Sequence, residues 1–478
     1  MDTLKANIGS AIQTEILQQI PLESAWAYRI VPFKKAEGKL HLWVDQERDN
    51  HFLVDEIALL FQIEVQLVPI DTDLLDEALF RHYPKGEQGY VRKSVNIGSE
   101  DFLDQLFQEA QHLKCSDIHI EAYENRRRIR FRLDGKLKER YVIEEVDYPS
   151  LINKIKILAN LDISEKRLPQ DGRILISNVS GELDIRVSVL PTHNTEKVVM
   201  RLLGGDAGKL SLDGLGMDHA DLRNYKEGIK RPTGIILITG PTGSGKTTTL
   251  YSTLKELNTE GTNIVTIEDP IEYTLEGINQ VQLRENIGLD FPRALRTFLR
   301  QDPDIIMVGE IRDVDTANMA IRAALTGHLV FSTIHTNSAW GAVNRLADMG
   351  IPHYMIANTL NTAVAQRLVR NLCPHCKSEV SFDPQLLPSG YTMPKSMETH
   401  FVSNGCEHCY HTGYKGRTAV YEVLPIDGDL SAAVYAQQND VRSLLQEKGI
   451  NSLSENAFEL FFNGITSLDE IYSLLYNY

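Results

Sequence analysis

Residues 240–247 read GPTGSGKT, and they restrict the fold of this chain more than any other stretch. They match the phosphate-loop pattern G-x-x-x-x-G-K-[ST], in which glycines let backbone N–H groups wrap phosphates, the lysine bridges the outer phosphates and the last hydroxyl holds Mg²⁺. An apolar run at 234–239 predicts a buried parallel strand before the loop, and residues 247–257 have the periodicity of a helix after it. The strand, loop and helix therefore come in the order that nucleotide binding requires.

The loop and the position after it give the residues that we expect to contact ATP. They are Gly240, Pro241, Thr242, Gly243, Ser244, Gly245, Lys246, Thr247 and Thr248. Three further apolar strands, at 263–267, 304–308 and 329–333, alternate with helical segments at 292–299 and 314–325. This alternation predicts an α/β fold in which a parallel sheet is covered by helices.

Polar residues at the carboxyl ends of these strands are the expected catalytic groups, because ligands of open α/β sheets bind there. The residues are Glu268, Asp269, Gly309, Glu310, His335 and Thr336. ATP hydrolysis needs a metal, charge neutralisation and a positioned water. We expect Glu310 and Thr247 to hold Mg²⁺, a carboxylate at 268–269 to orient or deprotonate the water, and His335 to sense the γ-phosphate. A structural hydrogen bond is the alternative for both His335 and His328, and phosphate sensing is expected less of His328 than of His335.

Four of the five cysteines form the pattern C-x₂-C-x₂₉-C-x₂-C, at Cys373, Cys376, Cys406 and Cys409. Two such pairs complete a closed tetrahedral Zn²⁺ site, which is structural rather than catalytic. Neighbouring histidines at 375, 408 and 411 are substitute ligands, although four cysteines suffice. Cys115 stands alone and is expected to be a buried small side chain.

Composition limits the partners. The 478 residues include 49 Lys and Arg against 65 Asp and Glu, a formal net charge of −16, so no nucleic-acid partner is expected. An arginine-rich run at Arg126, Arg127, Arg128, Arg130 and Arg132 leaves a local nucleic-acid patch open, but pairing with acidic neighbours explains it equally well. The apolar runs are only strand-sized, so we expect no membrane span and a soluble, cytoplasmic protein.

The chain is too long for one core. We expect an N-terminal accessory or docking domain at 1–90 and a second α+β domain at 95–205. A linker at 206–230 leads to the ATPase core at 231–372, which is followed by a tetracysteine insertion at 373–410 and a C-terminal subdomain at 411–478. Alternating or apolar runs predict strands at 40–44, 65–68, 117–121, 128–132, 183–189 and 416–423. Helical periodicity predicts helices at 52–61, 73–83, 100–113, 441–447 and 468–476, and residues 84–89 are typical of a linker.

Taken together, residues 116–424 resemble the secretion ATPases of type II secretion systems and type IV pilus assembly. The motifs that carry the resemblance are the phosphate loop at 240–247, an aspartate box at 266–273, a Walker B segment at 299–313 and a histidine box at 326–337. The resemblance implies a RecA-like motor core, a hexameric ring, and arginines supplied by the preceding domain at Arg173 and Arg186. It also implies that Glu268 is the catalytic carboxylate and Glu310 the metal-associated one.

The tetracysteine element resembles the insertion of export and pilus-extension members, which argues against a retraction motor. The resemblance thus predicts a hexamer that hydrolyses Mg·ATP to drive pseudopilus assembly for type II secretion, docked on an inner-membrane partner and peripheral to that membrane. The same motor serving a type IV pilus or DNA uptake is the alternative. A non-catalytic ATP-binding scaffold is disfavoured by intact Lys246, Glu268 and Glu310, and a nucleic-acid-translocating ring is disfavoured by the negative charge.

Overall fold

The computed structural model describes residues 12, 14–17, 19–36, 38–46, 53–61, 63–83, 101–124, 126–178, 181–203 and 211–476. The chain divides into two compact units, 1–93 and 94–478. The linker expected at 84–89 lies outside the described residues. Among the helices that are described, none has the length and apolar character needed to cross a bilayer.

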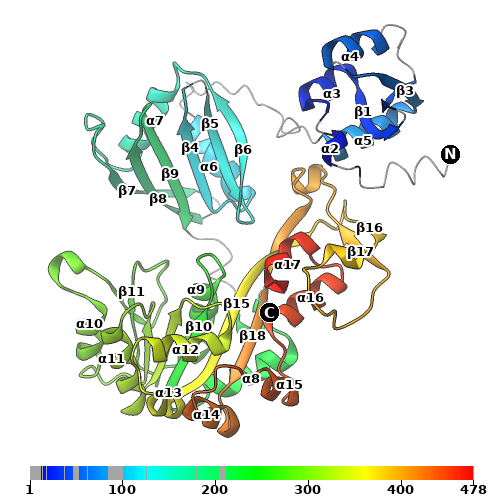
Figure 1. The fold of residues 1–478 in the computed structure, drawn as a ribbon. Helices are drawn as coiled ribbons and strands as arrows, with labels where there is room; N and C mark the ends of the chain where they lie inside the picture. Colours follow the sequence, from blue (N-terminus) through cyan, green and yellow to red (C-terminus); the bar gives the residue numbers. More distant parts are fainter. Residues whose placement is uncertain are drawn as a thin grey trace. The chain divides into compact units, whose positions relative to one another are not determined.

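The first unit is a small α+β fold around a three-stranded sheet, in blue in Figure 1. Its elements are α2 (Thr14–Leu17), α3 (Leu22–Tyr28), β1 (Ile30–Ala36), β2 (Lys39–Asp45), α4 (Leu53–Phe61), β3 (Val65–Ile70) and α5 (Thr72–His82). β1 pairs antiparallel and β3 parallel with the central β2. Phe33 stacks on the buried Trp43 at a ring-centroid distance of 4.5 Å. The strands and helices predicted here from alternation and helical periodicity are present.

In the second unit, residues 101–203 form an antiparallel sheet covered by two helices. The elements are α6 (Phe102–His112), β4 (Asp117–Ala122), β5 (Arg127–Leu133), β6 (Lys136–Ile143), α7 (Tyr148–Leu158), β7 (Gln170–Asn178), β8 (Gly181–Pro191) and β9 (Glu196–Leu203). The strand order is β6-β5-β4-β9-β8-β7. Apolar residues at alternate strand positions pack with both helices in one core, as period-two patterning requires.

The arginine-rich run at 126–132, which comprises most of β5 and the residue before it, is neutralised by acidic side chains. Arg128 and Arg130 both pair with the buried Glu121 on β4, and Arg132 pairs with Asp117. Arg126 pairs with Glu139 and Arg127 with Glu145. Of the two interpretations of this run, pairing with acidic neighbours is therefore the one that the structure bears out.

Residues 234–425 build a seven-stranded sheet in the order β12-β11-β13-β14-β10-β15-β18. The strands are β10 (Gly234–Thr239), β11 (Ile264–Glu268), β12 (Asn279–Gln282), β13 (Ile305–Val308), β14 (Leu329–Ile334), β15 (Leu360–Leu372) and β18 (Tyr414–Pro425). All neighbours are parallel except β18, which runs antiparallel to β15. The predicted α/β fold with a parallel core sheet is thus confirmed.

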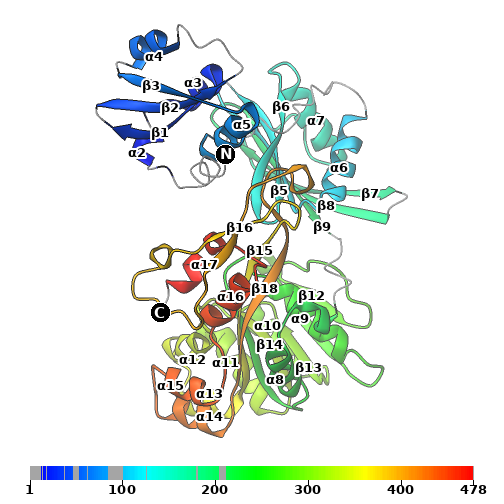
Figure 2. The same cartoon turned by 90° about the vertical axis from the view of Figure 1, so that its right-hand side faces the viewer.

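Helices cover both faces of this sheet (Figures 1 and 2). They are α8 (His219–Ile229), α9 (Lys246–Leu257), α10 (Phe291–Phe298), α11 (Val314–Leu325), α12 (Ala339–Asp348) and α13 (His353–Thr359). Successive residues of the buried β10 point to opposite faces: Ile235 and Leu237 pack with α10, α11 and α12, whereas Ile236 and Ile238 pack with α8 and α9. Burial on both faces explains why these strands are continuously apolar.

The stretch expected as a linker, 206–230, is structured in its second half. A 3₁₀ turn at Leu212–Leu215 leads into α8, and Asp218 caps that helix by accepting from the N–H of Asp221. Tyr225 and Ile229, four residues apart on α8, are buried against the core sheet. These two apolar positions make α8 part of the core rather than a connector.

The C-terminal region continues the paired strands β15 and β18. Between them lie the short strands β16 (Ser378–Ser381) and β17 (Thr399–Val402), and after them α14 (Gly428–Tyr435), α15 (Arg442–Glu447), α16 (Leu453–Phe462) and α17 (Leu468–Leu475). β16 and β17 pair with each other, and α14, α16 and α17 pack into the core cluster on the α12 face of the large sheet. The strand predicted at 416–423 and both tail helices are present.

Candidate functional site

The phosphate loop joins the end of β10 to the start of α9. Gly245 is the N-cap of α9 with φ of 90°, a left-handed conformation that suits glycine. At Gly240 the restriction is space, since an added Cβ would lie 2.4 Å from the carbonyl oxygen of Gln366 on the neighbouring strand β15. Gly243 also has a left-handed φ, of 82°, so all three glycines in the loop are favoured by the fold itself, before any ligand is considered.

Lys246 lies in the first turn of α9 and folds back over the loop. Its Nζ donates to the carbonyl oxygens of Gly240 at 2.9 Å and Pro241 at 3.0 Å. Burial lowers the pKa of Lys246, Arg367 lowers it further, and Glu310 acts in the opposite sense. Ser244, which is buried, has an Oγ without a hydrogen-bond partner among the described residues. The loop thus holds a half-buried cation and an unsatisfied hydroxyl where phosphate oxygens are expected.

Glu310 and His335 come from neighbouring strand ends and meet beside the loop. His335 Nε2 lies 3.4 Å from Glu310 Oε2, and its Nδ1 donates to the carbonyl oxygen of Gly240 at 3.1 Å. Arg312 also pairs with Glu310. Gly240, Glu310 and His335, which follow the strands β10, β13 and β14, therefore converge as predicted. The side chain of Thr247, in the first turn of α9, is exposed.

Glu268 is the last residue of β11, but its carboxylate points into the protein interior. Oε1 accepts from Thr266 Oγ1 at 2.6 Å and from Gln280 Nε2 at 3.2 Å, and Oε2 accepts from the Tyr251 hydroxyl. Burial and this bond to Glu268 raise the pKa of Tyr251, which keeps the phenol protonated as the donor. Both oxygens of Glu268 are thus committed to protein donors, which suits a positioning role better than contact with a water.

Glu272, four residues later in the aspartate box, is more accessible. Its side chain is 36% exposed, and its Oε2 lies 3.7 Å from Arg186 Nη1. Arg186 also donates to the carbonyl oxygen of Ile271. The sequence placed Glu272 within the aspartate box, but strand-end position and the family resemblance both gave the catalytic role to Glu268.

The second predicted arginine is held elsewhere. Arg173 forms a two-pronged ion pair with Asp184, with Nε–Oδ1 at 2.7 Å and Nη2–Oδ2 at 2.6 Å. It lies opposite Arg186 across the β7–β8 ladder, and its side chain is largely exposed. The structure therefore brings one of the two arginines, Arg186, to the aspartate box.

The remaining strand-end residues have structural contacts. His328 Nδ1 donates to the carbonyl oxygen of Ala323 at 2.9 Å, which matches the structural alternative. Thr336 bonds to Thr239 through its N–H at 2.7 Å and its hydroxyl at 2.6 Å. The carbonyl oxygen of Gly309 accepts from Thr333 Oγ1, and Asp269 is exposed. Sequence reasoning missed Arg367, which lies beside Gly240 in no recognised motif.

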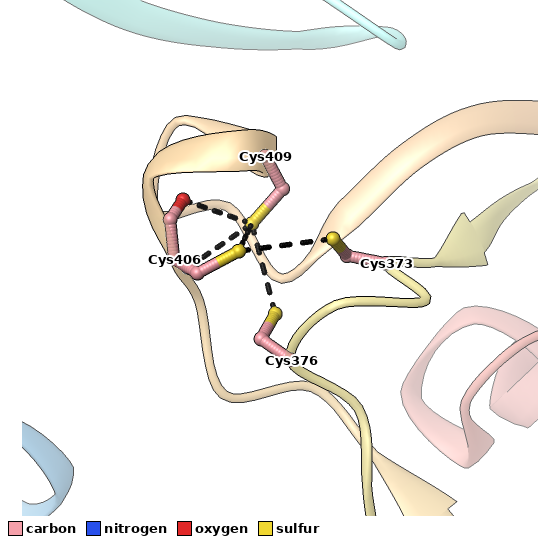
Figure 3. A group of neighbouring side chains, drawn as sticks. All are labelled: Cys373, Cys376, Cys406 and Cys409. Carbon is pink, nitrogen blue, oxygen red and sulfur yellow. Dashed lines mark hydrogen bonds between the residues drawn. The ribbon is translucent and has the colours of Figure 1, made fainter.

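The four predicted cysteines converge at the far end of the β15–β18 pair (Figure 3). Their Sγ atoms all lie within 4.8 Å of one another, with separations of 3.9 Å for Cys373–Cys406, 3.8 Å for Cys376–Cys409 and 3.7 Å for Cys406–Cys409. A tetrahedral ion with Zn–S bonds of about 2.3 Å spaces its sulfurs by about 3.8 Å. The sulfurs therefore fit Zn²⁺.

Backbone groups support the same cluster. The N–H groups of Cys406 and Gly413 both donate to Cys409 Sγ at 3.2 Å, which stabilises a thiolate. Cys115 is buried in the core of the 101–203 domain, away from this cluster, and burial raises its pKa to about 12. It is thus the inert, buried thiol that its isolation predicted.

Comparison with known proteins agrees with this geometry. Residues 96–473 match the family model described as type II/IV secretion system protein, and residues 9–89 match the MshEN domain. The type IV pilus assembly ATPase PilB of Myxococcus xanthus is 41% identical over 96% of this chain and 86% of its own length. The type II secretion system ATPase E of Vibrio cholerae is 45% identical over 93% of this chain and 87% of its own.

Among solved structures, the pilus retraction motor PilT with bound ADP is 27% identical and superposes with a TM-score of 0.53. The match covers 77% of this chain and 94% of that one. The sequence match, the shared fold and the convergence of the phosphate loop with the Walker B and histidine-box residues agree with one another. This chain belongs to the type II/IV secretion system protein family.

Proposed function

We propose that this chain is a Mg²⁺-dependent ATPase that powers pseudopilus assembly in type II protein secretion. The observation that carries the proposal is the meeting of Lys246, Glu310 and His335 at one edge of the sheet, beside a loop whose Ser244 hydroxyl is unsatisfied. Relatives named as a secretion ATPase and a pilus assembly ATPase, similar over nearly the whole chain, point to the same activity.

Each group has a proposed task in hydrolysis. Residues 240–248 bind the phosphates, and Lys246 exchanges its two carbonyl partners for phosphate oxygens. Thr247 and Glu310 hold Mg²⁺, which neutralises charge on the transferred phosphoryl group. His335, placed between Gly240 and Glu310, orients the site around the γ-phosphate.

For the carboxylate that handles the attacking water, the contacts favour Glu272 over Glu268. A general base needs an oxygen within reach of a water. Glu272 is partly exposed, whereas both oxygens of Glu268 are bonded to buried donors. Glu268 then fixes Tyr251 and Gln280 in the wall of the site.

The proposed assembly is a homohexamer in which the 95–205 domain supplies Arg186, and Arg173 after release from Asp184, to the nucleotide. A cation placed at the transferred phosphate raises turnover by orders of magnitude in related chemistry. The 1–90 domain would dock on an inner-membrane component, which makes the protein cytoplasmic and peripheral to that membrane. Zn²⁺ at the four cysteines stays structural, and no nucleic acid takes part.

The proposal is tested by measuring Mg²⁺-dependent ATPase activity against protein concentration, together with the mass in solution, with and without a non-hydrolysable ATP analogue. Specific activity should rise as hexamers form. A monomer that hydrolyses ATP equally fast would contradict completion of the site by assembly, and absence of hydrolysis in the hexamer would contradict the enzyme itself.

A second candidate is extension of a type IV pilus or DNA uptake, because the PilB relative matches 96% of the chain. Gene neighbours separate the two. Secretin and pseudopilin genes beside this one support secretion, whereas a major pilin and a retraction motor support a pilus.

A further inference from the structure

Two side chains of opposite charge hold the turn that follows His335. We call residues 335–339 the histidine-box turn. Arg367 on β15 donates through Nη2 to the carbonyl oxygen of Asn337 at 3.1 Å, and Glu422 on β18 accepts from the N–H of Ala339 at 2.8 Å. The two strands are neighbours, and Glu422 is paired with Ala365 in their ladder. Both side chains therefore reach the turn from the same face of the sheet.

Arg367 also lies beside Gly240 of the phosphate loop. Its Nη1 donates to the carbonyl oxygen of Gln366 at 3.0 Å, and it would lie 3.1 Å from a Cβ added to Gly240. In the described part of the chain no ion pair joins Arg367 to a carboxylate, and burial lowers its pKa. Arg370, three residues further along β15, is instead paired with Glu470 at 2.7 Å. Arg367 is thus a partly buried cation at the edge of the nucleotide site, where backbone oxygens accept its hydrogen bonds.

Glu422 connects the same turn to the C-terminal helices. Its other oxygen, Oε2, accepts from the N–H of Leu453, the first residue of α16, at 3.0 Å. The carboxylate is therefore buried between the starts of α12 and α16. Burial raises its pKa, and the N–H groups and dipoles of the two helix starts act in the opposite sense. A displacement of either helix start changes its bond to Glu422.

We propose that Arg367 and Glu422 are positioning residues that clamp the histidine-box turn against the phosphate loop and so fix His335 beside Glu310. Resting on the proposed ATPase function, this adds two residues that act through His335 rather than on the nucleotide. Without the clamp, Asn337 and Ala339 lose their fixed partners, and His335 loses the restraint two residues away. A shift of about 1 Å in a catalytic geometry can cost a hundredfold in rate.

The test compares Arg367→Ala with Arg367→Lys and with Arg345→Ala, which removes an exposed basic residue from α12 as a control. Arg367→Ala should lower kcat roughly ten- to a hundredfold, with less than about a threefold change in the Kd for ATP. Arg367→Lys should recover part of kcat because an ammonium can still donate to Asn337, and Arg345→Ala should match the wild type.

Dependence on His335 separates positioning from a general loss of structure. In a His335→Ala background, Arg367→Ala should lower kcat no further, since the two changes remove one arrangement. Full additivity would overturn the proposal. So would an Arg367→Ala variant that binds ATP at least tenfold more weakly with an unchanged kcat, because Arg367 would then contact the nucleotide directly.

Hydrogen exchange gives a readout that does not depend on activity. Peptides covering 335–339 should exchange faster in Arg367→Ala and in Glu422→Gln than in the wild type, while peptides of β11 remain unchanged. Glu422→Gln keeps the shape but can accept through only one atom, so it should release either Ala339 or Leu453. Unchanged exchange in both variants would refute the clamp. An inactive wild type with these exchange changes would refute only the ATPase proposal.

Discussion

The nucleotide site and the cysteine site lie along the same strand, β15, and they are organised differently. At the phosphate loop, Lys246 donates to loop carbonyls and His335 donates to Gly240, while the buried Ser244 hydroxyl has no partner among the described residues. The loop lies beside the middle of β15, whereas directly after the carboxyl end of that strand, beginning at Cys373, four sulfurs already have the spacing of a tetrahedral ion. The first arrangement suits a ligand that is exchanged in every cycle, and the second suits one that stays.

This difference has an energetic basis. Phosphates that enter the loop displace the hydrogen bonds that Lys246 makes to loop carbonyls. This competition reduces the net free energy of binding, so the ligand can leave again. Four thiolates gathered without a metal repel one another and lose their solvation, so a Zn²⁺ ion bound at these cysteines would contribute to folding rather than to turnover. We therefore expect changes at the phosphate loop to affect activity with little effect on folding, and changes at the cysteines to do the reverse.

Lys246→Ala should have the largest effect and tests one side of this comparison. Loss of the cation should lower ATP binding and hydrolysis by about two to three orders of magnitude, without changing the zinc content or the melting temperature. Nucleotide binding by fluorescence, turnover and metal analysis measure these three quantities. Lys230→Ala, an exposed change at the end of α8, is the control. Normal ATP binding in Lys246→Ala would remove the basis for the nucleotide site.

Replacing the two candidate carboxylates one at a time sharpens the nucleotide side. Glu272→Gln should bind ATP and hydrolyse it roughly a hundredfold or more slowly, with the melting temperature of the wild type. Glu268→Gln should also lose activity, but it should melt earlier because an amide cannot accept from Tyr251, Thr266 and Gln280 together. If Glu268→Gln is inactive with an unchanged melting temperature while Glu272→Gln turns over normally, Glu268 is the catalytic carboxylate.

Cys406→Ser should affect folding around the metal and leave nucleotide binding intact. The variant should lose its zinc and become sensitive to proteolysis between β15 and β18, because no metal then ties the two ends of residues 373–409 together. Metal analysis of freshly purified, reduced protein and limited proteolysis measure this. Cys115→Ser removes a thiol outside the cluster and should retain the zinc. A zinc-free wild type, or a large loss of ATP affinity in Cys406→Ser, would contradict the separation of the two sites.

The smallest expected effect concerns Asp221, a buried residue in the first turn of α8. Burial raises the pKa of Asp221 from 3.8 to about 7, and the charge of Asp218 adds to the rise. Because the folded state then holds a proton that the unfolded state has already released, stability falls as pH rises from about 4 to about 7 and levels off above that. Asp221→Asn should reduce the fall in melting temperature between about pH 4 and 7 by roughly a few degrees. If the melting temperatures of the variant and the wild type change equally with pH, the raised pKa of Asp221 is contradicted.

Local patterns explain which parts of the fold and sites could be predicted. The phosphate loop, the apolar strands and the paired cysteines are each encoded within a few neighbouring residues, so their types and places followed from sequence. The direction of Glu268 did not, because it depends on Tyr251 and Gln280 from other elements. Helix α8 was hidden because its two large buried side chains, Tyr225 and Ile229, stand among charged residues.

The clamp lies furthest beyond sequence reasoning. Asn337, Arg367 and Glu422 are separated by tens of residues and meet only after β14, β15 and β18 are placed in one sheet. No composition or spacing rule marks an arginine whose partners are backbone carbonyl oxygens. The arginines of β5, by contrast, were open to prediction because alternation and nearby acidic strands already suggested their partners.

The position of Glu422 between two helix starts also determines how far the chain tolerates shortening. A chain that ends before Leu453 would leave one carboxylate oxygen facing the space vacated by α16, without its donor. It would also strip the apolar partners Phe458 and Phe461 from the same core. Residues 453–476 are therefore part of the motor's folding unit, and excision of the cysteine segment for biochemical work should keep them in place.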